Sequence, residues 1–169
     1  MFRPFLRRRL NTGHTRRALL AVAVMNLFAL CGTALRADEP ANEGALDIVR
    51  RYACAEAHQG VAVDERYLYA IANRSIGKYD KQTGERVATW QDDEDGPLKH
   101  MNAGIVHDGK LYCAHSTYPH EPRLSSVEIW DADTLEHIGN HSFGEYGGAL
   151  NWVDWHDGHW WAVFAYYSR

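Results

Sequence analysis

The sequence predicts an all-β protein built from four-stranded antiparallel sheets. Aromatic residues make up 12% of its 169 residues, and aromatic side chains favour the pleated, half-buried surface of a sheet. From His58 to Trp90 short alternating segments are separated by turn residues, with no helical periodicity. A third observation, the recurrence of this stretch later in the chain, predicts how the sheets are organised.

Each expected element follows from local composition. We expect strands over residues 61–63, 67–72, 75–79 and 86–90, and a further strand over residues 45–53. The turns fall at 64–66, 73–74 and 80–84, and Gly84 stands where the last of them requires a positive φ. The acidic segment 91–97 lacks the spacing of an EF-hand and is predicted to be a solvated loop.

The recurrence of the stretch from His58 to Trp90 is visible in three turns that align in one register. These turns begin at Asp64, Asp108 and Asp157. Leu68–Tyr69 matches Leu111–Tyr112, and Tyr79, Asp80 and Thr83 match Trp130, Asp131 and Thr134. A repeat of about 45 residues that holds four strands is typical of a β-propeller blade.

The predicted fold class is therefore all-β, a partial β-propeller with about two and a half four-stranded antiparallel blades. The blades are expected at residues 58–90 and 102–143, with half of a third at 149–169, and residues 45–53 as a ring-closing outer strand. Since a closed ring needs at least about four blades, we expect a fragment of a six- or seven-bladed propeller. The alternative is an oligomer in which several chains complete one ring.

The N-terminus has the composition of a secretory signal peptide. Residues 1–37 contain seven arginines and no acid, and an apolar run spans 18–35. Residues 15–20 resemble a twin-arginine export motif, and a general secretory signal or an uncleaved anchor remain alternatives. We expect a signal peptide over 1–37, a linker over 38–44 and a periplasmic or secreted product, in contact with a membrane only through an uncleaved signal segment.

The charge of the remaining chain argues against nucleic-acid binding. From Asp38 onward there are 11 basic and 22 acidic residues, and an acidic surface repels phosphate backbones. Export makes a disulfide between Cys54 and Cys113 possible, but two buried thiols are the favoured interpretation. Neither cysteine has metal-ligand spacing.

The run from Leu68 to Trp90 resembles blades of secreted bacterial propellers in the broad YVTN, NHL and lactonase-like group. The run from His58 to Glu85 also resembles, more distantly, glutaminyl cyclotransferase propellers, which carry a Gln-Gly pair before the first inner strand and a D-x-x-T-G turn. The resemblance covers about residues 45–169. It implies a propeller, and it does not specify a reaction, because this architecture carries many chemistries.

The same alignment superposes polar residues just before each innermost strand, where a propeller has its central channel. We expect His58, Gln59, His100, Asn102 and Asn151 to converge on one channel mouth, bordered by Asn73, Arg74, His115, Ser116 and Tyr166. For Asn102 and Asn151, a role in holding blades together is an equal alternative. The remaining histidines, His107, His120, His137, His141, His156 and His159, are interpreted as turn or surface residues. The tryptophans, Trp130, Trp152, Trp155, Trp160 and Trp161, are interpreted as packing between blades.

The sequence therefore predicts an exported binding or scaffold propeller that holds a small polar molecule at the channel mouth. The rival hypothesis is an enzyme of the lactonase, cycloisomerase or glutaminyl cyclotransferase type, inactive as this fragment, with His58 or His100 as acid–base. No three residues have the spacing of metal ligands. No cofactor and no specific protein partner are predicted.

Overall fold

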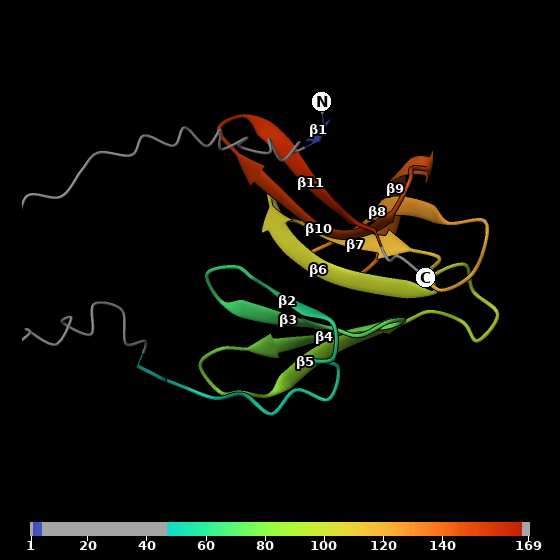
Figure 1. The fold of residues 1–169 in the computed structure, drawn as a ribbon. Coiled ribbons are helices and arrows are strands. Elements are labelled where there is room, and N and C mark those ends of the chain that lie inside the picture. Colours follow the sequence, from blue (N-terminus) through green and yellow to red (C-terminus); the bar gives the residue numbers. More distant parts are fainter. Residues whose placement is uncertain (1, 5–46, 167–169) are drawn as a thin grey trace, which may run out of the picture. The chain divides into compact units, whose positions relative to one another are not determined.

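The computed structural model describes residues 2–4 and 47–166 (Figure 1). Residues 52–166 and 2–4 belong to one compact unit, which consists of three sheets. Residues 47–51 belong to a separate unit and are exposed, without regular structure. The predicted linker, 38–44, and most of the predicted signal peptide lie outside the described residues.

The first two sheets are four-stranded antiparallel meanders. The first contains β2 (Gly60–Val63), β3 (Tyr67–Ile71), β4 (Ser75–Asp80) and β5 (Arg86–Gln91), in that order. The second contains β6 (His100–His107), β7 (Lys110–Ser116), β8 (Leu124–Asp131) and β9 (His137–Glu145). The described part of the chain has no helix, and so includes no apolar helix of membrane-crossing length. The prediction of an all-β protein with antiparallel four-stranded sheets is confirmed.

The third sheet has three strands. β10 (Ala149–His156) pairs antiparallel with β11 (His159–Ala165), and β1 (Phe2–Pro4) pairs parallel with the other edge of β11. β1 falls within the segment that the sequence predicts to be a signal peptide.

Turn chemistry accounts for the strand boundaries. Gly84 has the expected positive φ, 81°. At the equivalent turns after β4 and β8, Asp80 Oδ1 accepts the backbone N–H groups of Gln82 and Thr83, and Asp131 Oδ1 accepts those of Asp133 and Thr134. These hydrogen bonds satisfy backbone N–H groups of the turns that have no partner in the β-sheet.

One predicted strand does not form. Residues 47–53, the described part of the predicted ring-closing strand 45–53, have no strand structure. A strand needs a neighbouring edge that supplies N–H and C=O partners, and no described strand pairs with this segment. The prediction assumed a final blade as that partner.

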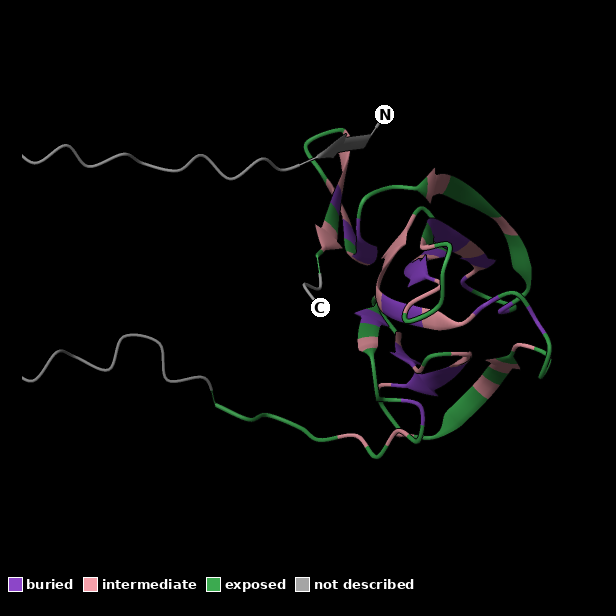
Figure 2. Ribbon diagram, turned by 45° about the vertical axis from the view of Figure 1, so that its right-hand side comes forward, coloured by how far each residue is buried: buried purple, intermediate pink, exposed green. Residues whose placement is uncertain are grey.

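Two apolar clusters hold the sheets together. The first includes Tyr69, Ile76, Leu111 and Trp130 from the first two sheets, and the second includes Val127 and Leu150 from the second and third. β2 contacts β6, and β6 contacts β10. β5 and β9 are mostly exposed (Figure 2).

Polar contacts also join the first two sheets. The hydroxyl of Tyr69 lies 2.7 Å from Asp64 Oδ2 and 2.8 Å from the carbonyl oxygen of Ala132. Burial, with the hydrogen bond to Asp64 and its charge, raises the pKa of Tyr69 far above its ordinary value, so this phenol remains a neutral donor.

The predicted packing of tryptophans between blades differs in outcome from one residue to another. Trp130 is fully buried between sheets, as expected, but Trp152 is 41% exposed, so packing between blades is wrong for Trp152 in this structure. Its side chain stands on a face of the third sheet that no other sheet in the described chain covers. Cys54 is half-buried and Cys113 buried, and both are free thiols.

Candidate functional site

A pocket of about 270 Å³ lies between the first and second sheets, near their outer strands, and we call it the inter-sheet pocket. The segment from β5 to the start of β6 contributes Trp90, Asp92, Pro97 and Leu98. The second sheet and its β7–β8 loop contribute His115, Thr117, Leu124, Ser125, Ser126, Glu128, His137, Asn140 and Ser142. Polar groups that converge on a concave surface define the default binding site of a protein.

A chain of hydrogen bonds runs along one wall of this pocket. His115 Nδ1 lies 2.9 Å from Ser126 Oγ, Ser126 Oγ lies 2.6 Å from Glu128 Oε1, and Glu128 Oε2 lies 2.8 Å from His137 Nε2. Strand register explains the order, because His115 faces Ser126 across the β7–β8 pair. Ser126, Glu128 and Trp130 point to one side of β8, since successive strand residues alternate. Glu128 is only 3% exposed.

The backbone determines the direction of these bonds. The N–H of Lys99 donates to His115 Nε2 at 3.1 Å, so Nδ1 carries the imidazole proton and donates to Ser126. Ser126 in turn donates to Glu128, and Glu128 also accepts the N–H of His137. Burial lowers the pKa of His115, with opposition from nearby Glu128, which favours the neutral imidazole that this scheme requires.

This direction argues against a serine nucleophile. In nucleophilic catalysis the histidine accepts the serine proton. Here His115 Nδ1 is a donor to Ser126, because its other nitrogen is already an acceptor. The chain therefore presents a buried carboxylate whose visible partners are a hydroxyl and an imidazole.

The residues predicted for a channel mouth lie in different environments. His58, Gln59 and Asn73 are exposed, in the turn before β2 and in the β3–β4 turn. Arg74 is half-buried, and its guanidinium binds the acidic loop through the carbonyl oxygens of Asp93 and Glu94 and the Asp92 carboxylate. Arg74 therefore anchors the acidic loop in this structure, and the loop packs around the Arg74 side chain.

His100, Asn102 and His115 lie near one another where β6 pairs with β7. His100 is half-buried, its ring centroid 5.7 Å from that of Tyr118. Burial lowers the pKa of His100, and a hydrogen bond with Asn102 opposes this effect. Of the ten residues predicted at or around the channel mouth, His115 is the one that also lines the inter-sheet pocket. Asn151 is half-buried at an irregularity of β10.

Asn102 bridges two sheets. Its side chain is 7% exposed, and Nδ2 donates to the carbonyl oxygen of Leu150 in β10 at 3.0 Å. The geometry favours the structural alternative for this residue. Asn102→Ala is expected to lower the free energy of unfolding by about 1–3 kcal/mol, because it leaves a buried carbonyl without its donor. Chemical denaturation of both proteins measures the loss, and a change below about 0.5 kcal/mol would contradict the structural role.

Three of the four residues in the hydrogen-bond chain of the inter-sheet pocket were not predicted as site residues. His137 was interpreted as a turn or surface residue, and Ser126 and Glu128 were not singled out. A usable signal was present: Glu128 alternates with Ser126 and Trp130 on one face of β8, and a carboxylate on a buried face requires a partner.

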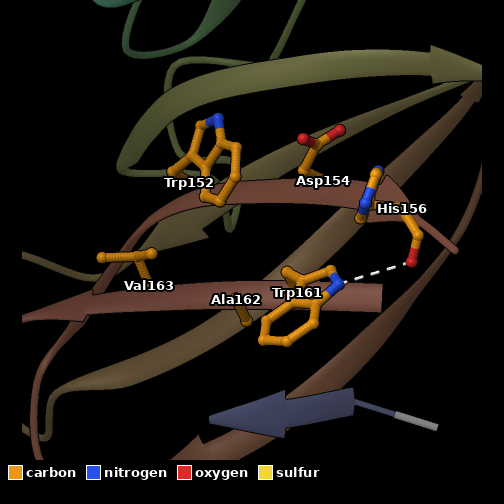
Figure 3. Close-up of a pocket in the computed structure, with 6 residues that line it drawn as sticks. All are labelled: Trp152, Asp154, His156, Trp161, Ala162 and Val163. Carbon is orange, nitrogen blue, oxygen red and sulfur yellow. Dashed lines mark hydrogen bonds between the residues drawn. The ribbon is translucent and has the colours of Figure 1, made fainter. Parts of the chain in front are cut away.

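A second hollow of about 280 Å³ lies on the open face of the third sheet (Figure 3). Its lining residues are Trp152, Asp154, His156, Trp161, Ala162 and Val163. Trp161 Nε1 donates to the carbonyl oxygen of His156 at 3.4 Å. Since only Asp154 and His156 bring polar side chains, this hollow has fewer convergent polar groups than the inter-sheet pocket.

Fold and site together define an all-β protein with a pocket between two antiparallel sheets, bordered by a chain of buried hydrogen bonds. Among the described residues, no group of His, Cys, Asp and Glu has an arrangement that holds a metal ion.

Comparison with known proteins does not assign this chain to a family. No protein-family model matches the sequence, and no curated protein is significantly similar to it. The computationally designed Ika4 protein is similar with a TM-score of 0.37 and 12% identity, over 72% of this chain and 93% of Ika4. The computationally designed Ika8 protein gives a TM-score of 0.30 and 14% identity, over 59% of this chain and 40% of Ika8. These TM-scores are too low to assign a fold family.

Proposed function

We propose that this chain is part of an exported β-propeller that binds a small polar ligand, and that the ligand occupies the inter-sheet pocket instead of a channel mouth. The observation that carries the proposal is the buried hydrogen-bond chain from His115 through Ser126 and Glu128 to His137, which borders a pocket of about 270 Å³. Polar groups held in place before binding lower the ordering cost of binding.

Three observations support the propeller part of the proposal. Two successive four-stranded meanders have the same strand order, β2 contacts β6 and β6 contacts β10, and the turns after β4 and β8 have the same hydrogen bonds. Export rests on the composition of residues 1–37 alone.

Binding has more support than catalysis. Of the two histidines predicted as acid–base groups, His58 is exposed and His100 packs against Tyr118. Ser126, which lies between His115 and Glu128, accepts a hydrogen bond from that histidine. These contacts orient a ligand and do not activate a nucleophile.

A thermal-shift panel of small sugars, amines and carboxylates tests the proposal. Ser142 lines the pocket from exposed β9, so Ser142→Trp fills the pocket without altering the core. Asn73→Trp adds the same bulk at the predicted channel mouth and is the matched control. We expect at least one class of compound to stabilise the wild-type chain and Asn73→Trp, but not Ser142→Trp.

Two outcomes would overturn the proposal. If Asn73→Trp loses stabilisation and Ser142→Trp keeps it, the ligand binds at the mouth. If no compound class stabilises the wild-type chain, the pocket is not a small-ligand site.

A further inference from the structure

We infer that the inter-sheet pocket takes a small organic cation, of the alkylammonium or guanidinium class, whose charge compensates Glu128. This inference rests on the proposed function and specifies its ligand. It is carried by the contrast between two buried carboxylates, one that lies against the first sheet and one that belongs to the second.

The carboxylate that lies against the first sheet belongs to Glu56, which is in the turn before β2 and is 7% exposed. It fills the space above Gly77, where an added Cβ would collide with it. Tyr79 donates to Oε2 at 2.5 Å, and Arg86 donates to Oε1 at 2.7 Å. Burial by itself raises the pKa of Glu56, but these two hydrogen bonds, a backbone hydrogen bond and the charge of Arg86 together hold its pKa below the ordinary value. The chain therefore supplies this carboxylate with its own cation.

Strand register identifies the corresponding residues of the second sheet. Arg86 of β5 is opposite Tyr79 of β4, and His137 of β9 is opposite Trp130 of β8. Both pairings follow an irregularity at the preceding position. Counting two residues back from Tyr79 and from Trp130 gives Gly77 and Glu128. The Glu128 carboxylate thus comes from the strand itself, and His137 stands where the first sheet has Arg86.

The presence of histidine in place of arginine at this position removes a permanent positive charge. Arginine is charged at every physiological pH, whereas neutral imidazole donates one N–H without a charge. A buried carboxylate with no cationic partner carries a large desolvation penalty. Glu128 is buried and borders open space, so a cation that enters the pocket removes that penalty.

The other charges around the pocket do not compensate Glu128. Asp92 is paired with Arg74 at 3.3 Å, and His115 is the neutral donor described above. Among the described residues that line the pocket, none is Lys or Arg. With neutral imidazoles the lining therefore has one negative charge that no permanent cation balances.

The same two sheets already hold one ammonium group in this manner. Lys78 is 3% exposed, and its Nζ lies 4.0 Å from the centroid of the Tyr67 ring. It donates to the carbonyl oxygen of Asp133 at 2.8 Å and lies 3.5 Å from Asp133 Oδ1. The inter-sheet pocket offers the same kinds of partner in Trp90 and Glu128, and aromatic rings attract cations within about 6 Å.

Calorimetric titration of the full chain with three probes of equal length tests the inference. Butylammonium, butanol and butyrate share one shape and differ in charge. At mildly alkaline pH, we expect butylammonium to bind at least about tenfold more tightly than butanol, and butyrate more weakly than both.

Two variants and one control locate the effect. Glu128→Gln keeps the shape and removes the charge, and should weaken butylammonium binding by at least about tenfold. His137→Arg copies the Glu56–Arg86 pair, so it should abolish binding while it raises the melting temperature. This second variant keeps the test decisive if Glu128→Gln does not fold. Glu56→Gln removes the buried carboxylate that lies against the first sheet and should leave the affinity unchanged.

The results separate the two proposals. Equal affinities for butanol and butylammonium, tighter binding of butyrate, absence of butylammonium binding, or binding that survives His137→Arg would each overturn the cation inference. The proposed function itself stands or fails by the response of Ser142→Trp to the wider panel of compounds.

Discussion

Trp130→Ala is expected to lower the free energy of unfolding by about 3–5 kcal/mol, the usual cost of truncating a fully buried aromatic residue. Trp130 has no exposed surface, and its ring packs edge-on against Trp90 of the neighbouring sheet, with ring centroids 5.0 Å apart. It also contacts His137, at 4.9 Å between centroids. The alanine variant would leave a cavity where the two sheets meet, beside the inter-sheet pocket.

The loss is measured by urea unfolding followed by far-ultraviolet circular dichroism. Trp152→Ala is the matched control, because Trp152 is 41% exposed on the open face of the third sheet. We expect the control to cost no more than about 1 kcal/mol. Equal losses for the two variants would show that the first and second sheets do not pack as described. Since whole domains are stable by only about 5–15 kcal/mol, the Trp130 variant should approach global unfolding.

Gly60→Val is expected to cost about 1–3 kcal/mol, the usual effect of overpacking a close contact. A Cβ at position 60 would lie 2.7 Å from Ala103 Cα and 3.0 Å from the carbonyl oxygen of Asn102. Both are backbone atoms of β6, so they cannot rotate away as a side chain does. The substitution therefore forces β2 and β6 apart.

The same denaturation assay measures this effect, with Val63→Ile as the control. Val63 lies in the same strand and is 57% exposed, so its additional methylene group enters open space. We expect a change of no more than about 0.5 kcal/mol for the control. A Gly60→Val protein as stable as the wild type would contradict the close approach of the first strands of the two sheets, on which the propeller proposal depends.

The inter-sheet pocket shows why a site is harder to predict than a fold. Alternation along β8 predicts that Ser126 and Glu128 share a face, but it does not say what covers that face. The pairing of His115 with Ser126 and of Trp130 with His137 depends on strand register. His58 and His100 were the predicted acid–base groups because they are imidazoles that precede the innermost strands of the repeat. The structure gives the most connected polar network to His115 and His137.

The sequence by itself determined the elements whose causes are local. Period-two alternation determined the strands of the first sheet, Gly84 its last turn, and Asp80 and Asp131 the matching turns after β4 and β8. Each depends on residues within a few positions, so each is present in the linear pattern.

Only the tertiary structure decided which strands pair and which side chains distant in sequence bind one another. Residues 47–53 have strand-forming composition but no edge to pair with, and Asn102 is a bridge between sheets because the carbonyl of Leu150 lies opposite it. Glu56 and Glu128 are carboxylates of equal chemistry, yet one is paired with Arg86 and the other with His137. Residues distant in sequence supply these partners, and the free energy of a buried charge depends on the partner as much as on the charge itself.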